Sequence, residues 1–239
     1  MIKGVLIDLG KTVLTNRIID FEKGISAIYQ ISDKKMNYQE YYNTHLKLYN
    51  ITFKYLHRFN LEMRISDYLN SLNELTNITI NKTNEEIEDI FLENIVSEEL
   101  ILGIEDLLKY FNSQNIPVIA VSNSCLSGRA LSKELEEFKI LKYFKKVISS
   151  ADTYVRKPKK EIFDYAVNYL KMITNDLTIK NDEIIFIGND YECDVIGAKN
   201  IGLSTVWFNQ ERKDDIYNLC DINIATYNEL LDIMKKYRP

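Results

Sequence analysis

The sequence predicts an α/β fold in which a parallel sheet is covered by helices on both faces and an all-helical segment is inserted after the first strand. Two observations carry this prediction. Short apolar runs alternate with amphipathic stretches of helical length along most of the chain, an order typical of parallel sheets. The segment 16–100 departs from this order, because it contains helical patterns and no comparable apolar strand.

Five apolar runs of strand length are expected to form the sheet. They lie at 4–8, 116–122, 145–149, 184–188 and 203–208. Amphipathic helices are expected between them, because apolar residues recur with helical spacing ahead of the second and the third strand. These residues are Ile104, Leu107, Leu108 and Phe111, followed by Leu131, Leu135 and Phe138.

The inserted segment is expected to hold four helices, at about 22–31, 36–58, 61–75 and 83–96. The last one begins with a capping-box pattern, since Thr83 stands three residues before Glu86. The stretch "YQEYYNTHLKLYNITFKYLHRF" is rich in tyrosine, and aromatic residues at helical spacing favour a buried face over a substrate-facing one. We therefore expect two units. A core is formed by 1–15 and 101–239, and a helical insertion is formed by 16–100.

Composition and charge narrow the class of protein. With 239 residues, of which 46% are hydrophobic, the chain can bury one large core or a core plus a smaller unit. The 30 basic and 35 acidic side chains give a formal charge of −5 without a basic cluster, which argues against nucleic acid and anionic membranes as partners. No apolar run approaches the roughly 18 residues of a membrane span, and the N-terminus lacks a signal-peptide pattern. The oligomeric state is left open.

The cysteines and histidines indicate a reducing compartment and no zinc site. Cys125, Cys193 and Cys220 are odd in number and not closely paired, so reduced thiols in the cytoplasm are expected. His45 and His57 have no cysteine nearby, and their spacing does not match a zinc site. Both histidines are expected at the surface or in a groove.

Polar residues follow four of the predicted strands, at the edge where open parallel sheets bind ligands. Asp8 follows the first strand, Ser122 and Asn123 the second, Lys157 the third, and the stretch 188–194 the fourth. Each alone has an ordinary structural explanation, such as a turn, a helix cap or a proline at a helix start. Together, and in this order around a helical insertion, they form a far less common set.

This set resembles the motifs of the haloacid dehalogenase superfamily of hydrolases, in the subgroup with a helical, C1-type cap. The first motif, a strand followed by Asp-x-Asp-Gly-Thr, corresponds to Asp8 through Thr12. The second motif is similar to "VIAVSN" through Ser122, the third to "VRKP" through Lys157, and the fourth to "IGNDYECD". The likeness covers residues 1 to about 209 and implies a Rossmann-like core with a helical cap over 16–100.

The resemblance implies a phosphatase that forms an aspartyl-phosphate intermediate and acts on a small phosphorylated molecule. Asp8 is the implied nucleophile, and Lys157 is implied to neutralise the charge of the phosphate. A carboxylate and a phosphate repel each other, so the site needs positive charge and hydrogen-bond donors. The hydroxyls of Thr12 and Ser122 and the backbone N–H of Asn123 are the expected donors to the phosphoryl oxygens.

Carboxylates crowd the same site, which favours a bound cation. Asp8, Asp190 and Asp194 would repel one another unless a cation joined them, and Mg²⁺ prefers oxygen ligands. The resemblance implies that the metal is held by the nucleophile, by the backbone carbonyl of Gly10 and by an acid at the position of Asn189. Because an amide carries no charge, either Asn189 binds the metal more weakly or Asp190 compensates for it.

Gly10 stands where most phosphatases of this superfamily carry a second aspartate, which acts as general acid and base. Such a group contributes about 10² to 10⁴-fold in rate, so a slower or more selective phosphatase is the leading interpretation. A 2-haloacid dehalogenase is an alternative, because it needs neither this acid nor a metal. That branch typically has an aromatic residue at this position and a cap arginine at a spacing that Arg17 and Arg58 do not match.

A non-catalytic binding module is the third interpretation, because Gly10 and Asn189 both depart from the motifs and fold alone does not fix function. The motif residues that are retained count against it. They are Asp8, Thr12, Ser122, Lys157 and Asp194.

Basic residues near the motifs are interpreted as solvated. Lys11 stands where the superfamily usually has glycine, and Arg156 beside Lys157 is interpreted as surface charge. Recognition of an anionic substrate by Arg17, Arg58 or Arg64 is given little weight, since most arginines on helices lie in water.

Overall fold

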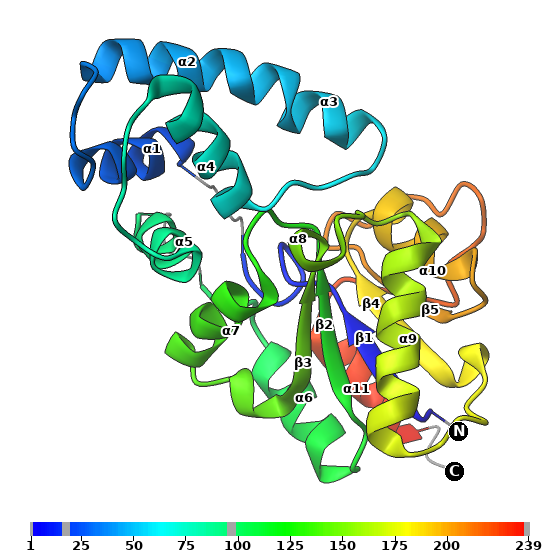
Figure 1. Ribbon diagram of the computed structural model, residues 1–239. Coiled ribbons are helices and arrows are strands. Elements are labelled where there is room, and N and C mark those ends of the chain that lie inside the picture. Colours follow the sequence, from blue (N-terminus) through cyan, green and yellow to red (C-terminus); the bar gives the residue numbers. More distant parts are fainter. Residues whose placement is uncertain (1, 16–19, 95–98, 237–239) are drawn as a thin grey trace.

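The computed structural model describes residues 2–15, 20–94 and 99–236. Its centre is a six-stranded parallel sheet in the order β3-β2-β1-β4-β5-β6 (Figure 1). The strands are β1 (Gly4–Ile7), β2 (Val118–Ser122), β3 (Phe144–Ser149), β4 (Ile184–Gly188), β5 (Ser204–Phe208) and β6 (Ile222–Ile224). The predicted parallel α/β architecture is confirmed. The short strand β6 was not predicted, because three residues are too few to show a strand pattern.

β1 lies in the middle of the sheet and pairs with β2 on one side and with β4 on the other. The chain runs outward from β1 to β3 on one side and from β4 to β6 on the other, so the strand order reverses between β1 and β4. Ligands bind to open α/β sheets at such a reversal, beyond the carboxyl ends of the strands. Asp8 directly follows β1 and is therefore placed at this point.

Alternate residues of β1 face two separate cores. Val5 and Ile7 belong to one hydrophobic cluster, and Leu6 belongs to the other. Helices pack over both clusters, as predicted. Those over the first are α6 (Ile104–Ser113), α7 (Gly128–Glu137) and α11 (Tyr227–Lys236), and those over the second are α9 (Lys160–Thr174) and α10 (Gly197–Lys199).

Between β1 and α6 the described chain forms helices joined by loops, with isolated β-bridges and no longer strand. The capping box of Thr83 and Glu86 is confirmed. Helices α1 to α4 gather beyond the carboxyl ends of the strands, on the side where β3 runs into α8 (Ser150–Thr153) (Figure 1). The unit boundaries at 16 and 100 stay a prediction, and residues 95 and 96 lie outside the described residues. The inserted helices are α1 (Phe21–Gln30), α2 (Tyr38–Ile51), α3 (Phe53–Arg58), α4 (Ile65–Thr76) and α5 (Asn84–Glu93).

The helix predicted over 36–58 is interrupted, so the prediction of one continuous helix is wrong. The chain leaves helical geometry at Thr52, where φ is −107° and ψ is −86°. The Thr52 N–H and hydroxyl both donate to the Leu48 carbonyl, at 2.9 and 2.7 Å. A threonine hydroxyl bound in this way bends a helix, which accounts for the break between α2 and α3.

The interior of the inserted helices is aromatic, as the tyrosine-rich stretch predicts. Tyr41, Phe53 and Tyr68 are fully buried. His45 lies among them, so its expected position at the surface or in a groove is wrong, because α2 packs this face against α4. Its Nδ1 lies 2.6 Å from the Tyr68 hydroxyl oxygen. Burial lowers the pKa of His45 to about 4.

We expect His45 to weaken the fold as pH falls. The folded protein keeps the imidazole neutral down to about pH 4, whereas the unfolded chain takes up a proton near its ordinary pKa of 6.5. The free energy of unfolding should therefore fall by about 2 kcal/mol between about pH 7.5 and pH 5 from this group alone. His45→Asn keeps an acceptor for Tyr68 and removes the titrating ring. Urea unfolding of this variant should lose that part of the pH dependence, and an unchanged dependence would contradict the prediction.

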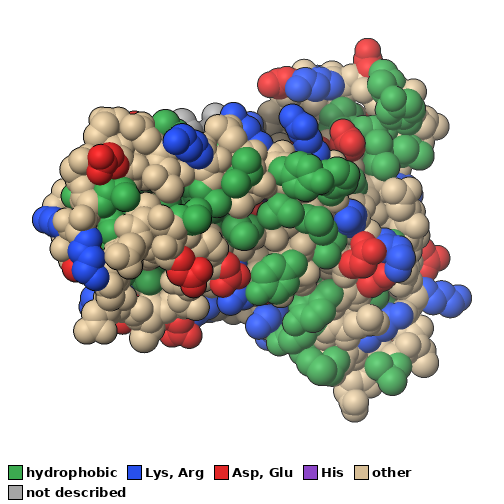
Figure 2. Space-filling view, turned by 45° about the horizontal axis from the view of Figure 1, so that its top comes forward, with side chains coloured by type: hydrophobic (Ala, Val, Ile, Leu, Met, Phe, Trp, Pro, Cys, Tyr) green, Lys and Arg blue, Asp and Glu red, His purple; other side chains and the backbone are tan. Residues whose placement is uncertain are grey.

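The surface mixes charges of both signs. On the face shown in Figure 2, basic side chains are scattered among acidic and hydrophobic ones. Within the described parts of the chain, no helix is both long enough and apolar enough to cross a membrane. The exclusion of nucleic acid as a partner stays a prediction.

Candidate active site

Asp8, Lys157 and Asp194 meet at the carboxyl edge of the sheet. Lys157 Nζ lies 2.6 Å from Asp8 Oδ1 and 2.7 Å from Asp194 Oδ1. All three side chains are buried. Burial lowers the pKa of Lys157, but the charges of Asp194 and Asp8 outweigh it and raise the pKa above its ordinary value. The lysine is therefore an ammonium that faces two carboxyl groups.

The turn after β1 presents Asp8 at the sheet edge. The Asp8 N–H donates to the Ile187 carbonyl at 2.9 Å, so the pairing of β1 with β4 continues up to the turn. The Leu9 carbonyl then accepts from the Val13 N–H at 2.8 Å, which closes the turn. Lys11 inside it has a φ of 59°, a left-handed conformation that glycine adopts with less strain. This geometry explains why the superfamily motif that the sequence resembles usually has glycine at the position of Lys11.

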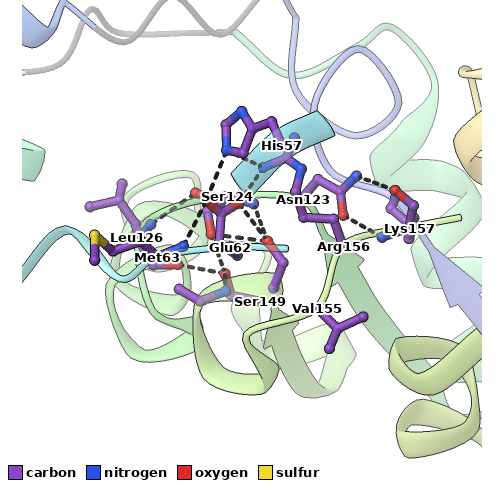
Figure 3. Close-up of polar contacts among 12 residues, drawn as sticks. His57, Glu62, Met63, Asn123, Ser124, Leu126, Ser149, Val155, Arg156 and Lys157 are labelled. Atoms are coloured by element: carbon purple, nitrogen blue, oxygen red, sulfur yellow. Dashed lines mark hydrogen bonds and ion pairs between the residues drawn. The ribbon is translucent and has the colours of Figure 1, made fainter. Parts of the chain in front are cut away.

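The side chain of Asn123 holds the backbone of Lys157. Its Oδ1 accepts from the Lys157 N–H at 2.8 Å, and its Nδ2 donates to the Lys157 carbonyl at 3.0 Å (Figure 3). Since Asn123 directly follows β2, these two hydrogen bonds fix the segment ahead of α9 against the sheet. The amide side chain is thus engaged with Lys157.

Asp194 packs against the end of β4. A Cβ atom on Gly188 would lie 2.3 Å from Asp194 Oδ2, so this close approach requires glycine. Asp194 Oδ2 accepts from the Asp190 N–H at 3.0 Å, while Oδ1 binds Lys157. Burial raises the pKa of Asp194, the charge of Lys157 opposes this effect, and the charge of Asp8 adds to it.

These residues surround a cavity of about 340 Å³. Thr12 is fully buried and lies outside the cavity lining. Gly10 faces open space, because a Cβ atom placed on it would meet no atom within 4 Å. The structure therefore brings the predicted site residues to one place. Those that line the cavity are Asp8, Gly10, Ser122, Asn123, Lys157, Asn189, Asp190 and Asp194.

Oxygen atoms around Thr12 suit a hard cation. The Thr12 hydroxyl lies 3.1 Å from Asp8 Oδ2 and 3.2 Å from Asn189 Oδ1. A hydroxyl has one proton, so it donates to only one of these oxygens at a time, and the other has a lone pair to offer. Gly10 lines the cavity together with Asp8 and Asn189, and a carboxylate, an amide and a peptide oxygen are donor types that fit Mg²⁺.

The carboxylates of the fourth motif contribute less directly to such a site. Both oxygens of Asp194 already have protein partners. Asp190 Oδ1 accepts from the Cys193 N–H at 2.8 Å and caps η3 (Tyr191–Ile196). Among the residues that the structure describes, no group of three or more His, Cys, Asp or Glu is arranged to hold a metal ion. The predicted roles of Asp190 and Asp194 as metal ligands stay predictions.

Arg156 is not the surface charge that the sequence suggests. It forms an ion pair with Glu62, whose side chain is fully buried in the loop between α3 and α4. It also lines the 340 Å³ cavity. No sequence pattern marks this pair, because its members stand 94 positions apart. Arg64 pairs with Asp152 at 3.0 Å, and Arg17 lies outside the described residues.

A second, larger hollow adjoins the first. Its volume is about 870 Å³, and it shares Lys11, Asn189 and Asp190 with the smaller cavity. Trp207 and Phe208, at the end of β5, form part of its lining. The two hollows together can accept a molecule larger than a phosphate ion.

Comparisons with known proteins converge on one family. A family model described as haloacid dehalogenase-like hydrolase matches residues 16–208. Pyrimidine 5'-nucleotidase YjjG of Escherichia coli (strain K12) is 28% identical over 104 residues, which are 43% of this chain and 44% of that protein. Glyceraldehyde 3-phosphate phosphatase of Pyrococcus furiosus is 28% identical over 112 residues, which are 45% of this chain and 42% of that protein. The aligned stretch thus spans less than half of each curated relative.

Solved structures share the fold over the whole chain. The crystal structure of 2-haloacid dehalogenase from Pseudomonas syringae pv. Tomato DC3000 matches with a TM-score of 0.62 and 17% identity, and the match covers 100% of both chains. At this level of identity the likeness shows a common fold and carries no statement about substrate.

Proposed function

Because the chain belongs to the haloacid dehalogenase-like hydrolase family, we propose that it is a Mg²⁺-dependent phosphatase that hydrolyses a small phosphorylated metabolite. One observation carries the proposal: a buried lysine ammonium lies 2.6 Å from the carboxylate of Asp8, beside an open cavity. A carboxylate placed in this way can attack an anionic substrate, because the adjacent cation offsets their repulsion. The two phosphatases among the relatives support the same reaction class.

The proposed first step is attack by a carboxylate oxygen of Asp8 on the phosphorus atom of the substrate. A bond forms between that oxygen and phosphorus, the bond to the leaving-group oxygen breaks, and the leaving group takes up a proton from water. Water then attacks the phosphorus of the aspartyl-phosphate. This second step releases inorganic phosphate and restores the Asp8 carboxylate.

Lys157 is proposed to offset the negative charge that Asp8 and the phosphoryl group bring together. Ser122 lines the cavity and is proposed to donate a hydrogen bond to a phosphoryl oxygen, together with the backbone N–H of Asn123. Thr12 lies 3.1 Å from Asp8 Oδ2, so we propose that it orients this carboxylate, while its binding of phosphate stays a prediction.

Asp8, the Gly10 carbonyl and Asn189 would hold Mg²⁺, with Asp190 next to them in the cavity lining. When bound, the ion supplies further positive charge to the phosphoryl oxygens. Asp194 is proposed to keep Lys157 in place, since its two oxygens bind the lysine ammonium and the Asp190 N–H.

The inserted helices are proposed to act as a cap over this site, opening to admit substrate and closing to exclude water. The leaving group would then lie in the hollows beside Asp8, which share Lys11 and Asn189. A cytoplasmic location, with a small phosphorylated molecule as partner, belongs to the same proposal.

Gly10→Asp is expected to raise kcat for substrates with poor leaving groups. The site lacks a general acid at this position, and the open space in front of Gly10 accepts a side chain. A positioned acid contributes about 10² to 10⁴-fold, so a gain of about 10-fold or more is expected with glycerol phosphate and a smaller one with p-nitrophenyl phosphate. Gly10→Asn, which has the same size and no acidic proton, is the matched control. An equal effect of both substitutions would contradict the prediction.

Removal of metal tests the proposed function directly. We expect the protein to release phosphate from p-nitrophenyl phosphate and acetyl phosphate with Mg²⁺, to lose this activity in EDTA and to regain it when Mg²⁺ is added back. Chloride release from 2-chloropropionate without metal would replace the proposal with a dehalogenase. Inactivity in every assay would replace it with a binding module.

A further inference from the structure

A loop of the inserted helices pairs with the segment that leads into Lys157. This loop, residues 59–64, joins α3 to α4, and we name it the docking loop. Its partner segment, 154–156, directly precedes Lys157. Two backbone hydrogen bonds hold them together and form an antiparallel β-bridge between Leu61 and Val155. The Arg156 N–H donates to the Asn60 carbonyl and the Glu62 N–H donates to the Tyr154 carbonyl, both at 3.0 Å.

Glu62 places a buried carboxylate between the docking loop and the core. Its Oε2 accepts from the Ser150 hydroxyl at 2.9 Å and pairs with Arg156, while Oε1 accepts from the Met63 N–H at 3.2 Å and lies 3.1 Å from His57 Nε2 (Figure 3). Burial raises the pKa of Glu62, but the hydrogen bond from His57 and the charge of Arg156 outweigh it and lower the pKa. The residue therefore stays ionised while fully enclosed by protein.

The positive charge of Arg156 is neutralised by Glu62. Its guanidinium lines the cavity that contains Asp8, but Glu62 neutralises it and His57 Nε2 lies 3.2 Å from its Nη1. A substrate anion at Arg156 would compete with a buried carboxylate to which no other cation of the described residues lies as close. These contacts therefore favour a role for Arg156 in fixing the segment 154–156 over a role in binding a substrate anion.

Lys157 is thus held from two sides. On one side the Asn123 side chain binds its backbone N–H and carbonyl. On the other side the residue before it is bound by Glu62 through its guanidinium and by Asn60 through its N–H. The lysine ammonium must reach Asp8 within hydrogen-bond distance, so a shift of this segment changes the charge that Asp8 experiences.

We propose that Glu62 is a positioning residue that acts through Arg156 to place the Lys157 ammonium against Asp8. The ammonium then takes its catalytic position beside Asp8 only when the docking loop is bound to the segment 154–156. This inference rests on the proposed function, because it assigns Lys157 a part in phosphoryl transfer. It couples the seating of the inserted helices to the chemistry at the sheet edge.

Glu88 offers a matched control elsewhere in the same contact between inserted helices and core. It is also a buried carboxylate, on α5, and it accepts from the N–H and the hydroxyl of Ser127 and lies 3.3 Å from Arg129. These partners start α7 and lie outside the 340 Å³ cavity lining. A purely structural role for buried cap carboxylates would affect Glu62 and Glu88 alike.

Steady-state kinetics with p-nitrophenyl phosphate and Mg²⁺ separate these cases. In Glu62→Gln, kcat is expected to fall about 10- to 100-fold, with KM changed by less than about threefold, because misplacement of Lys157 acts on the chemical step. Glu88→Gln is expected to keep kcat within about twofold. Glu62→Asp, which retains the charge, should recover at least about threefold of the lost kcat.

The double variant Glu62→Gln/Arg156→Gln tests whether Glu62 acts through Arg156. If it does, kcat of the double variant equals that of Arg156→Gln alone, since the second loss has no further effect. A rise in KM with unchanged kcat in Arg156→Gln would assign the arginine to substrate binding and overturn the proposal. Equal losses of kcat in Glu62→Gln and Glu88→Gln would also overturn it.

Hydrogen exchange provides a readout that does not depend on activity. Amides of residues 154–157 are expected to exchange at least about fivefold faster in Glu62→Gln than in the wild type, and to be unchanged in Glu88→Gln. An inactive wild type would remove the proposed function but leave this measurement decisive for the coupling. Unchanged exchange in Glu62→Gln would remove the coupling even if the wild type is an active phosphatase.

Discussion

Replacement of Asp8 with Asn is expected to reduce phosphate release by about 10⁴-fold or more, because an amide nitrogen or oxygen does not replace the carboxylate as nucleophile. The substitution preserves the size of the side chain, so the fold around β1 should persist. Steady-state release of inorganic phosphate measures the loss. Acid quenching of the wild type with labelled acetyl phosphate should trap phosphate on the protein, and the variant should trap none.

A neighbouring carboxylate provides the control for this substitution. Asp190→Asn removes a negative charge in the same cavity but keeps an oxygen that can cap η3 through the Cys193 N–H. Its kcat is expected to fall by less than about 100-fold, since Asp190 is not proposed to form a bond to phosphorus. Comparable losses in the two variants, or an Asp8→Asn variant with a tenth of wild-type activity, would contradict the role of Asp8.

The sequence was sufficient to predict which residues share the sheet edge. Asp8 and Asn189 directly follow strands that the apolar pattern marks, Ser122 is the last residue of another, and the carboxyl ends of parallel strands meet at one edge. The proximity of Lys157 to Asp8 follows from the same rule, because its segment continues from the end of β3. This part of the site was predictable because apolar residues recur at short, regular intervals within each strand and each amphipathic helix.

Contacts between the inserted helices and the core were beyond the reach of sequence patterns. The pair of Glu62 and Arg156 depends on how the docking loop sits on the core, and no local periodicity encodes that placement. His45 is a different case, since its spacing from Tyr41 and Leu48 puts it on the buried face of α2. The helical spacing therefore indicated that His45 is buried, whereas its polar imidazole was expected at the surface or in a groove.

The local departures also have physical reasons. Lys11 adopts the left-handed conformation of a turn without the glycine that usually occupies it, so the chain tolerates the strain in order to complete the same turn. Thr52 breaks a helix because its hydroxyl binds the Leu48 carbonyl. The sequence signal of such a single residue is weaker than that of the apolar pattern around it, so the pattern decides the prediction.

Lys157→Met is expected to impair both activity and folding. The ammonium is the partner of two buried carboxyl groups, Asp8 and Asp194, and methionine fills a similar volume without charge. Loss of the cation leaves an uncompensated buried charge, which typically costs about 3 to 5 kcal/mol of unfolding free energy. We expect kcat to fall by about 10³-fold, since the charge that offsets the phosphoryl group is gone.

The pH dependence of this loss identifies its cause. Without Lys157, burial and mutual repulsion raise the pKa of Asp194 further, so the folded protein retains a proton that the unfolded chain releases near pH 4. An acid whose pKa is raised in the folded state loses stability as pH increases above its ordinary value. The destabilisation in urea unfolding should therefore be larger at pH 8 than at pH 5. Lys160→Met removes an exposed lysine that pairs with Asp164 at 3.0 Å, and it should change the unfolding free energy by less than about 1 kcal/mol at either pH. If the two lysine variants lost stability equally, or if Lys157→Met were equally destabilised at both pH values, the buried charge cluster would not be the source of the effect.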